Sequence, residues 1–138
     1  MAWTSEQYNA FIAKKSAPKE VKKRVQHESL LQQQAVKWYD LTYPNDRLRL
    51  FSIPNEGQRS VANASRMKAQ GRRAGVADMF FMTRYNSDDK GVYIEFKAGK
   101  GKQSESQVEF EKVVNECGYD YYVIDSLESF MKIIKRHY

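Results

Sequence analysis

Cysteine is nearly absent from this sequence, with Cys117 as the single one among 138 residues. One thiol excludes an internal disulfide and any zinc site built from several cysteines. Long apolar runs are also missing: no stretch approaches the roughly 20 residues that span a bilayer, and the first residues do not resemble a signal peptide. These absences predict a soluble, cytoplasmic protein.

Acidic residues are outnumbered by basic ones, 17 to 23, which gives a net charge of +6 and a pI near 9.4. Such a balance suits an anionic partner such as nucleic acid, but many basic proteins bind none. The chain is 41% hydrophobic and 13% aromatic, which is typical of one globular domain with a buried core.

The apolar patterns predict an α/β fold, in which helices flank a mixed sheet whose middle strands form an antiparallel hairpin. The expected helices cover residues 2–13, 24–42, a short part of 55–75, 104–117 and 126–136. The expected strands cover residues 47–54, 77–85, 91–97 and 119–125. The basic, proline-containing stretch 14–24 is expected to be a linker, and no internal repeat is visible.

The stretch 91–107, GVYIEFKAGKGKQSESQ, carries two charged residues on an otherwise apolar strand. Because alternate residues of a strand share a face, the apolar residues at 92, 94 and 96 point one way, and Glu95 and Lys97 point the other. The simplest interpretation is a solvent-exposed face with a surface ion pair of little energetic weight.

Asp78 gives a reason to consider a polar site instead. It precedes the apolar run MFFM, and the polar turn NSDDKG returns the chain antiparallel, so Asp78 and Glu95 can lie close together across the hairpin. Two carboxylates beside a lysine suit a hard cation such as Mg²⁺, which commonly takes one or two carboxylates plus a substrate phosphate. Without Glu95 and Lys97, a turn-capping aspartate would be the favoured interpretation of Asp78.

Two expected helices carry further polar residues toward this region. Glu28 falls on an apolar helix stripe, where a carboxylate is costly unless it is paired or bound to metal. In the first turns of its helix it would also be favoured by the helix dipole. Gln107 completes a capping box with Ser104, which explains it structurally, and it also lies on the apolar stripe of its helix. Both interpretations stay open for each residue.

Five blocks of sequence resemble the VRR-NUC (virus-type replication-repair nuclease) domain, a branch of the PD-(D/E)XK nucleases. They are HESLLQQQAVKW, SIPNEGQRS, MKAQGRRAGVAD, IEFKAGKGKQSESQ and GYDYYVIDS. GVAD followed by IEFK reproduces the D…E-x-K motif. The departure is Ala77, where the family usually has proline. The resemblance implies the PD-(D/E)XK restriction-endonuclease-like core, with residues 24–138 as the nuclease domain and residues 1–23 as an N-terminal arm and basic linker.

The resemblance also implies a metal-dependent hydrolase of phosphodiester bonds. Mg²⁺ or Mn²⁺ would be bound by Asp78 and Glu95, with the main-chain carbonyl of Phe96 as a third ligand and Glu28 completing the acidic cluster. Lys97 would orient or deprotonate the attacking water. Gln107 matches the helix glutamine that lies near the site in the family. His27 and His137 are not expected to take part, His27 because it reads as a helix-surface residue.

Basic residues on both sides of these positions are expected to contact DNA phosphates: Arg59, Arg66, Lys68, Arg72, Arg73, Lys100 and Lys102. No zinc finger or helix-turn-helix signature is visible, so we expect selection of DNA by shape.

Stand-alone members of the family, found in phages and bacteria, resemble homodimers that act on four-way (Holliday) junctions, and this chain has that size. A nuclease for flaps, nicks or single strands is the alternative. A non-catalytic nucleic-acid-binding module is a third reading, against which the intact set of Asp78, Glu95 and Lys97 argues.

Overall fold

The computed structural model describes residues 4–54, 61–85 and 88–138, and for residues 8 and 11–21 it describes the backbone alone. Along the chain, the elements are α1 (Ser5–Thr42), the 3-10 turn η1 (Arg47–Arg49), β1 (Leu50–Ser52), α2 (Val61–Ala69), β2 (Met79–Phe81), β3 (Val92–Phe96), α3 (Glu105–Glu116), β4 (Asp120–Ile124) and α4 (Leu127–His137). None of the helices within the described ranges is both long and apolar enough to cross a membrane.

The four strands form one mixed sheet in the order β1-β2-β3-β4. The pairs β1–β2 and β2–β3 are antiparallel, and β3 and β4 are parallel. The α/β architecture and the antiparallel hairpin expected from the sequence are thus confirmed. Because β2 and β3 are the inner strands, residues at the end of their hairpin are held by neighbours on both sides.

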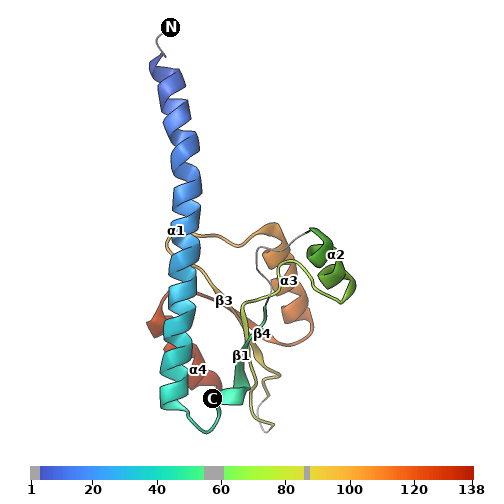
Figure 1. Ribbon diagram of the computed structural model, residues 1–138. Helices are drawn as coiled ribbons and strands as arrows, with labels where there is room; N and C mark the ends of the chain where they lie inside the picture. The colour runs from blue at the N-terminus through green and yellow to red at the C-terminus, as the bar shows by residue number, and fades with distance from the viewer. Residues whose placement is uncertain (1–3, 55–60, 86–87) are drawn as a thin grey trace.

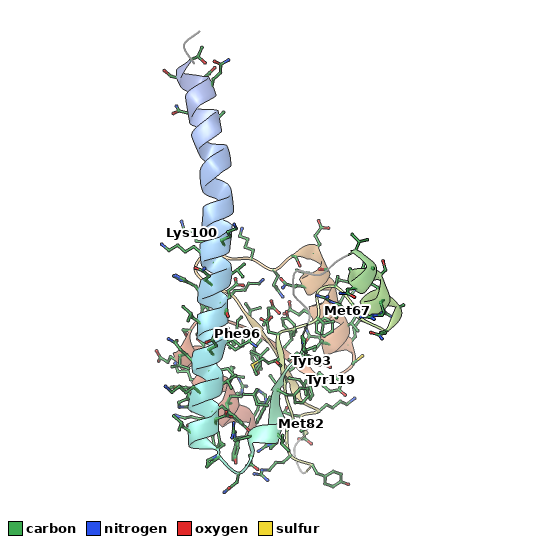
Figure 2. The ribbon with its side chains drawn as sticks, in the orientation of Figure 1. Met67, Met82, Tyr93, Phe96, Lys100 and Tyr119 are labelled. Carbon is green, nitrogen blue, oxygen red and sulfur yellow. The ribbon has the colours of Figure 1, made fainter. Side chains whose placement is uncertain are left out.

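Helices cover both faces of the sheet (Figure 1). On one face, α1 and α4 pack through Tyr39 and Phe130 against the apolar side chains of β3, including Ile94 and Phe96. On the other face, α3 packs through Phe110 and Val114 against a smaller cluster, which also contains Ala77, Tyr93, Tyr119 and Tyr121. Figure 2 shows Tyr93 and Tyr119 next to each other on this second side. The face that carries Glu95 is therefore covered, and the interpretation of that face as solvent-exposed is wrong.

Helix α1 differs most from expectation, because a short helix and a linker were expected where one helix runs from Ser5 to Thr42. A capping box starts it: the Thr4 hydroxyl accepts the amide hydrogen of Gln7, and the Gln7 side chain accepts that of Thr4. The residues that follow include many lysines, alanines and glutamines, which favour helix. The linker prediction for residues 14–24 is therefore wrong.

The first two strands are shorter than expected. Residues 47–49 form a 3-10 turn, and β1 contains only Leu50–Ser52 of the expected 47–54. β2 contains only Met79–Phe81 of the expected 77–85. The apolar pattern continues past each strand end because neighbouring residues still pack on the core after the ladder of hydrogen bonds has ended, as Ala77 does.

His137 fixes the end of α4 to the starts of β3 and β4, although its place in the sequence suggested no role. Its side chain is 8% exposed. Its Nδ1 lies 2.7 Å from Oδ2 of Asp89, and its Nε2 lies 2.9 Å from the hydroxyl of Tyr122. We call Asp89, Tyr122 and His137 the α4 clasp.

We expect His137→Ala to lower the free energy of unfolding by about 1.5–3 kcal/mol, because it removes a buried hydrogen bond to a carboxylate. Urea denaturation followed by circular dichroism measures this loss. His27→Ala is the matched control, since His27 is exposed on α1 and its loss should change stability by less than about 0.5 kcal/mol. Equal effects of the two substitutions would contradict a structural role for the clasp.

Candidate active site

Asp78 lies one residue before β2, at the point where the hairpin places it across from Glu95. The register pairs Met79 with Ile94, so the next pair along the ladder joins Asp78 and Glu95. The backbone amide of Phe96 donates a hydrogen bond of 2.8 Å to Oδ2 of Asp78. The carbonyl of Asp78 accepts a hydrogen bond of 2.8 Å from the amide of Ile53. Asp78 is therefore held on both sides by neighbouring strands.

Glu95 is buried on the sheet face beneath α3, with 3% of its surface exposed. Its Oε1 lies 3.5 Å from Nζ of Lys97, which is two residues further along the same face. The sequence predicted that these two residues share a face, and the structure adds that the face is a closed polar site. A buried carboxylate of this kind is costly unless its charge is compensated.

Gln107 has both of the roles that the sequence left open, because it caps α3 and also contacts the candidate site. Its Oε1 accepts the amide hydrogen of Ser104, and its own backbone amide donates to the Ser104 hydroxyl, so the capping box is formed. Its Nε2 donates a hydrogen bond of 2.7 Å to Oε1 of Glu95. The first turn of α3 is thus tied directly to the buried carboxylate.

The surroundings of Glu95 disfavour its charged form. Burial and, to a smaller extent, the negative charge of Asp78 raise the pKa of Glu95 to about 8, against the opposing effect of Lys97. At neutral pH, the carboxyl would hold its proton unless a positive charge were added beside it.

The residues at this site fit a divalent cation. Within the described part of the chain, Oε2 of Glu95 is buried and has no hydrogen-bond partner, while Oε1 is engaged by Gln107 and Lys97. A buried carboxylate oxygen that accepts no hydrogen bond, next to a second carboxylate, is well suited to bind a metal ion. The ion would also remove the electrostatic penalty for ionising Glu95.

Glu28 reaches the edge of the same region from α1. Its Oε1 accepts a hydrogen bond of 3.3 Å from the amide of Ala98, two residues beyond Phe96. The side chain is half-buried. Glu28 therefore binds the turn that follows β3, three residues beyond Glu95 in the chain.

A pocket of about 320 Å³ opens next to Asp78 and Gln107. Two of the expected DNA-contacting residues line it, Lys68 of α2 and Arg72 of the turn after α2, together with Ser104 and Ser106 at the start of α3. Basic side chains and the positive end of a helix suit an anion.

The remaining basic residues lie further out. Arg66 is exposed on α2, and Lys100 and Lys102 are exposed in the turn after β3. Arg73 is exposed and its guanidinium donates to the carbonyls of Lys68 and Arg72. Arg59 lies outside the described residues.

Gly75 is a site residue that the sequence analysis did not single out. It has a φ of +82°, and a Cβ at this position would lie 2.3 Å from the carbonyl oxygen of Ser106. Only glycine allows the chain leading into Asp78 to touch the backbone of α3 so closely. The glycine in GRRAGVAD is the signal, but the partner of the contact is not visible in the sequence.

A second group of possible metal ligands occurs among the described residues, formed by Asp89, Asp120 and His137. It lies at the starts of β3 and β4, where Val92 pairs with Asp120, whereas Glu95 lies near the end of β3. Two of its members, Asp89 and His137, already bond to each other in the α4 clasp, and Asp120 Oδ2 lies 3.8 Å from His137 Nδ1. It is therefore separate from the site at Asp78 and Glu95.

The raised pKa of Glu95 predicts how the metal-free protein responds to pH. An unfolded chain releases this proton near pH 4.5 and the folded chain near pH 8, so stability is lost as pH rises through that window. Glu95→Gln removes the titration. In chelator, we expect the variant to gain about 2–4 kcal/mol over the native chain between pH 5 and pH 8.5, since one pKa unit corresponds to about 1.4 kcal/mol.

Urea denaturation at several pH values measures this difference. Glu109→Gln, at an exposed position of α3, is the matched control. A constant difference between Glu95→Gln and the native chain across the window would show that Glu95 is ionised in the folded protein.

Comparison with known proteins agrees with this geometry. The family model described as the VRR-NUC domain matches residues 12–128. A solved structure described as a VRR_NUC domain protein has a TM-score of 0.67 with this chain and 18% sequence identity, and the match covers 80% of this chain and 86% of that one. At this identity, the likeness concerns the fold alone. No curated protein matches the sequence.

The family match spans most of the chain and includes every position of the candidate site. This protein therefore belongs to the VRR-NUC family and has the fold of a nuclease of the PD-(D/E)XK type.

Proposed function

We propose that this protein is a divalent-metal-dependent endonuclease for branched DNA, and that it resolves four-way (Holliday) junctions as a homodimer. The observation that carries the nuclease chemistry is the meeting of Asp78, Glu95 and Lys97 at one end of the hairpin. Membership of a nuclease family supports the reaction class. The preference for junctions rests on the resemblance to stand-alone members of the family and on the size of the chain.

Asp78 and Glu95 are the proposed ligands of Mg²⁺ or Mn²⁺. The main-chain carbonyl of Phe96 is proposed as a third ligand, and Glu28 as an outer member of the acidic cluster. When bound, the ion supplies Lewis acidity toward a phosphoryl oxygen and lowers the pKa of a bound water. The partnerless Oε2 of Glu95 supports this assignment.

Lys97 is proposed to hold the attacking water in line with the scissile phosphodiester bond. Its Nζ lies 3.5 Å from the Glu95 carboxylate, and its side chain is only 13% exposed. An ammonium in this position can position a water and counter the charge that develops on the phosphoryl oxygens. The hydrolysis then breaks the P–O bond to the leaving oxygen and forms one to the water oxygen.

Gln107 is proposed as a positioning residue. By donating to Oε1 of Glu95, its amide leaves Oε2 as the free oxygen of that carboxylate. The capping box fixes the amide in turn, because Ser104 binds the other end of the same side chain. The rotamer of Glu95 is therefore set from α3.

The pocket beside Asp78 is proposed to receive a phosphate of the cleaved strand. Arg72 and Lys68 line it along with the first turn of α3, so positive charge faces the place where the backbone must pass. Arg59, Arg66, Arg73, Lys100 and Lys102 are proposed to contact phosphates further along the DNA.

A homodimer is proposed because a symmetric junction presents two equivalent strands to cut. Two copies related by a two-fold axis would place two active sites at a fixed spacing. We assign the dimer contact to residues 1–13, whose apolar members Trp3, Tyr8 and Phe11 have side chains outside the described part of the structure.

Asp78→Asn, Glu95→Gln and Lys97→Ala should each lower the rate of junction cleavage by at least about a hundredfold, because each removes a ligand or the group that holds the water. DNA binding in chelator should stay within about threefold of the native chain. Cleavage of a labelled four-way junction with Mg²⁺ or Mn²⁺ measures the rate, and chelator should abolish it. Lys112→Ala, at an exposed position of α3, is the control. Near-native cleavage by Glu95→Gln would overturn the assignment.

Deletion of residues 1–13 should convert a dimer into a monomer and abolish paired cuts on opposing strands of a mobile junction. Sedimentation at micromolar concentration measures the first effect, and a circular plasmid that extrudes a junction measures the second, since paired cuts linearise it and single cuts nick it. If the native chain sediments as a monomer and cuts flaps faster than junctions, the junction assignment is wrong and the nuclease acts on flaps.

A further inference from the structure

The N-terminal half of α1 stands clear of the rest of the molecule (Figure 1). Core contacts begin at Leu31 and continue through Ala35 to Tyr39. By contrast, the described side chains of residues 22–27 are all exposed. The backbone of α1 is helical throughout this segment, so its described side chains are held away from the domain. This segment therefore has its surface available for another molecule.

The exposed segment carries a concentration of positive charge. Residues 14–24, KKSAPKEVKKR, contain six basic residues and one acidic residue. The net charge of this segment is therefore +5, close to the net charge of +6 of the whole chain. Lys22, Lys23 and Arg24 follow one another on α1 and are all exposed, so their like charges repel one another. A polyanion bound along the segment would turn that repulsion into attraction.

The charged segment leaves the domain beside the active site. Glu28, four residues after Arg24, bonds to the amide of Ala98, and Ala98 follows Lys97 in the chain. A groove of about 440 Å³ at this junction is lined by Lys23 and Arg24 of α1 and by Lys100 of the turn after β3. Figure 2 shows Lys100 against α1 at the level where the helix leaves the body. Positive charge is therefore continuous from the edge of the site onto the helix.

We propose that residues 14–24 of α1 form a helical arm that binds the phosphate backbone of duplex DNA next to the cleaved bond. The proposal rests on the nuclease function proposed above and adds a second contact surface to it. From Lys14 to Arg24 the helix rises about 15 Å at 1.5 Å per residue. A turn of duplex is about 34–36 Å, so the arm follows roughly half a turn of the DNA that leads away from the site.

Duplex DNA is the occupant that the charges favour. The arm has almost no acidic side chains in residues 14–24, and its basic residues would contact phosphates without reading sequence. The arm would thus add affinity on a continuous duplex or junction branch, but it would not change the chemistry at Asp78 and Glu95.

The test compares two triple variants with the same change in charge. Lys22→Gln, Lys23→Gln and Arg24→Gln together neutralise the described part of the arm. Lys132→Gln, Lys135→Gln and Arg136→Gln together neutralise exposed positions of α4 and serve as the control. Glutamine keeps the helix propensity of lysine and arginine, and circular dichroism checks that the helix content is retained.

Binding to a 30-base-pair duplex and to a four-way junction is measured by fluorescence anisotropy in chelator, between 50 and 200 mM salt. For the arm variant, we expect the slope of log Kd against log salt to fall by about 2–3, since each lost phosphate contact contributes about 0.9. At about 100 mM salt, Kd should rise by about ten- to a hundredfold. The control should change Kd by less than about threefold, and Lys22→Arg with Lys23→Arg should keep the native slope.

Equal slopes for the arm variant and the control would overturn the proposal. So would an arm variant that loses dimerisation in sedimentation while its slope stays native, because the segment would then bind protein rather than DNA. The binding assay uses no cleavage, so it separates the two proposals. If the native chain cuts no DNA, the nuclease function is wrong. If the native chain cuts DNA but the arm variant has the same slope of log Kd against log salt, only the proposal about the arm is wrong.

Discussion

The structure depends on keeping one carboxylate out of water. Glu95 lies on the face of an inner strand that a helix must cover, and an isolated charge there would be prohibitively costly. Gln107 and Lys97 offset part of this cost through Oε1, and the bond from Gln107 ties the first turn of α3 to the strand. Oε2 is left over. Under the proposed function, a cation bound beside this oxygen would offset the remaining cost of the charge.

The parts of the fold that could be predicted from the sequence are those encoded within a few residues. The capping box of Ser104 and Gln107 marks the start of α3, and alternation of apolar residues marks β3 and its two faces. The polar turn NSDDKG marks the hairpin, and from the hairpin the approach of Asp78 to Glu95 follows by counting. The motif and its local geometry were therefore accessible, and so was the mixed sheet.

The features that could not be predicted depend on contacts between distant residues. The close approach of Gly75 to Ser106 requires the placement of α3 against the loop before β2. The α4 clasp joins residues that are 48 positions apart. The continuous helix α1 was missed for another reason, because a proline and a run of lysines suggested a linker while a capping box further upstream starts the helix. For Gly75 and for the α4 clasp, the local sequence indicates the chemistry of the residue but not the residue that it contacts.

The placement of Glu95 on an inner strand has a consequence for how the chain reaches its active form. Ile94 pairs with Met79 on one side, and Glu95 pairs with Val123 on the other. If β3 slipped by a single residue, Glu95 would enter the apolar layer beneath α1 and α4, and a large apolar side chain would take its place under Gln107. Such a state would bury a carboxyl without any partner and would be too unstable to accumulate. The correct register of β3 is therefore favoured by the same residue that occupies the candidate active site.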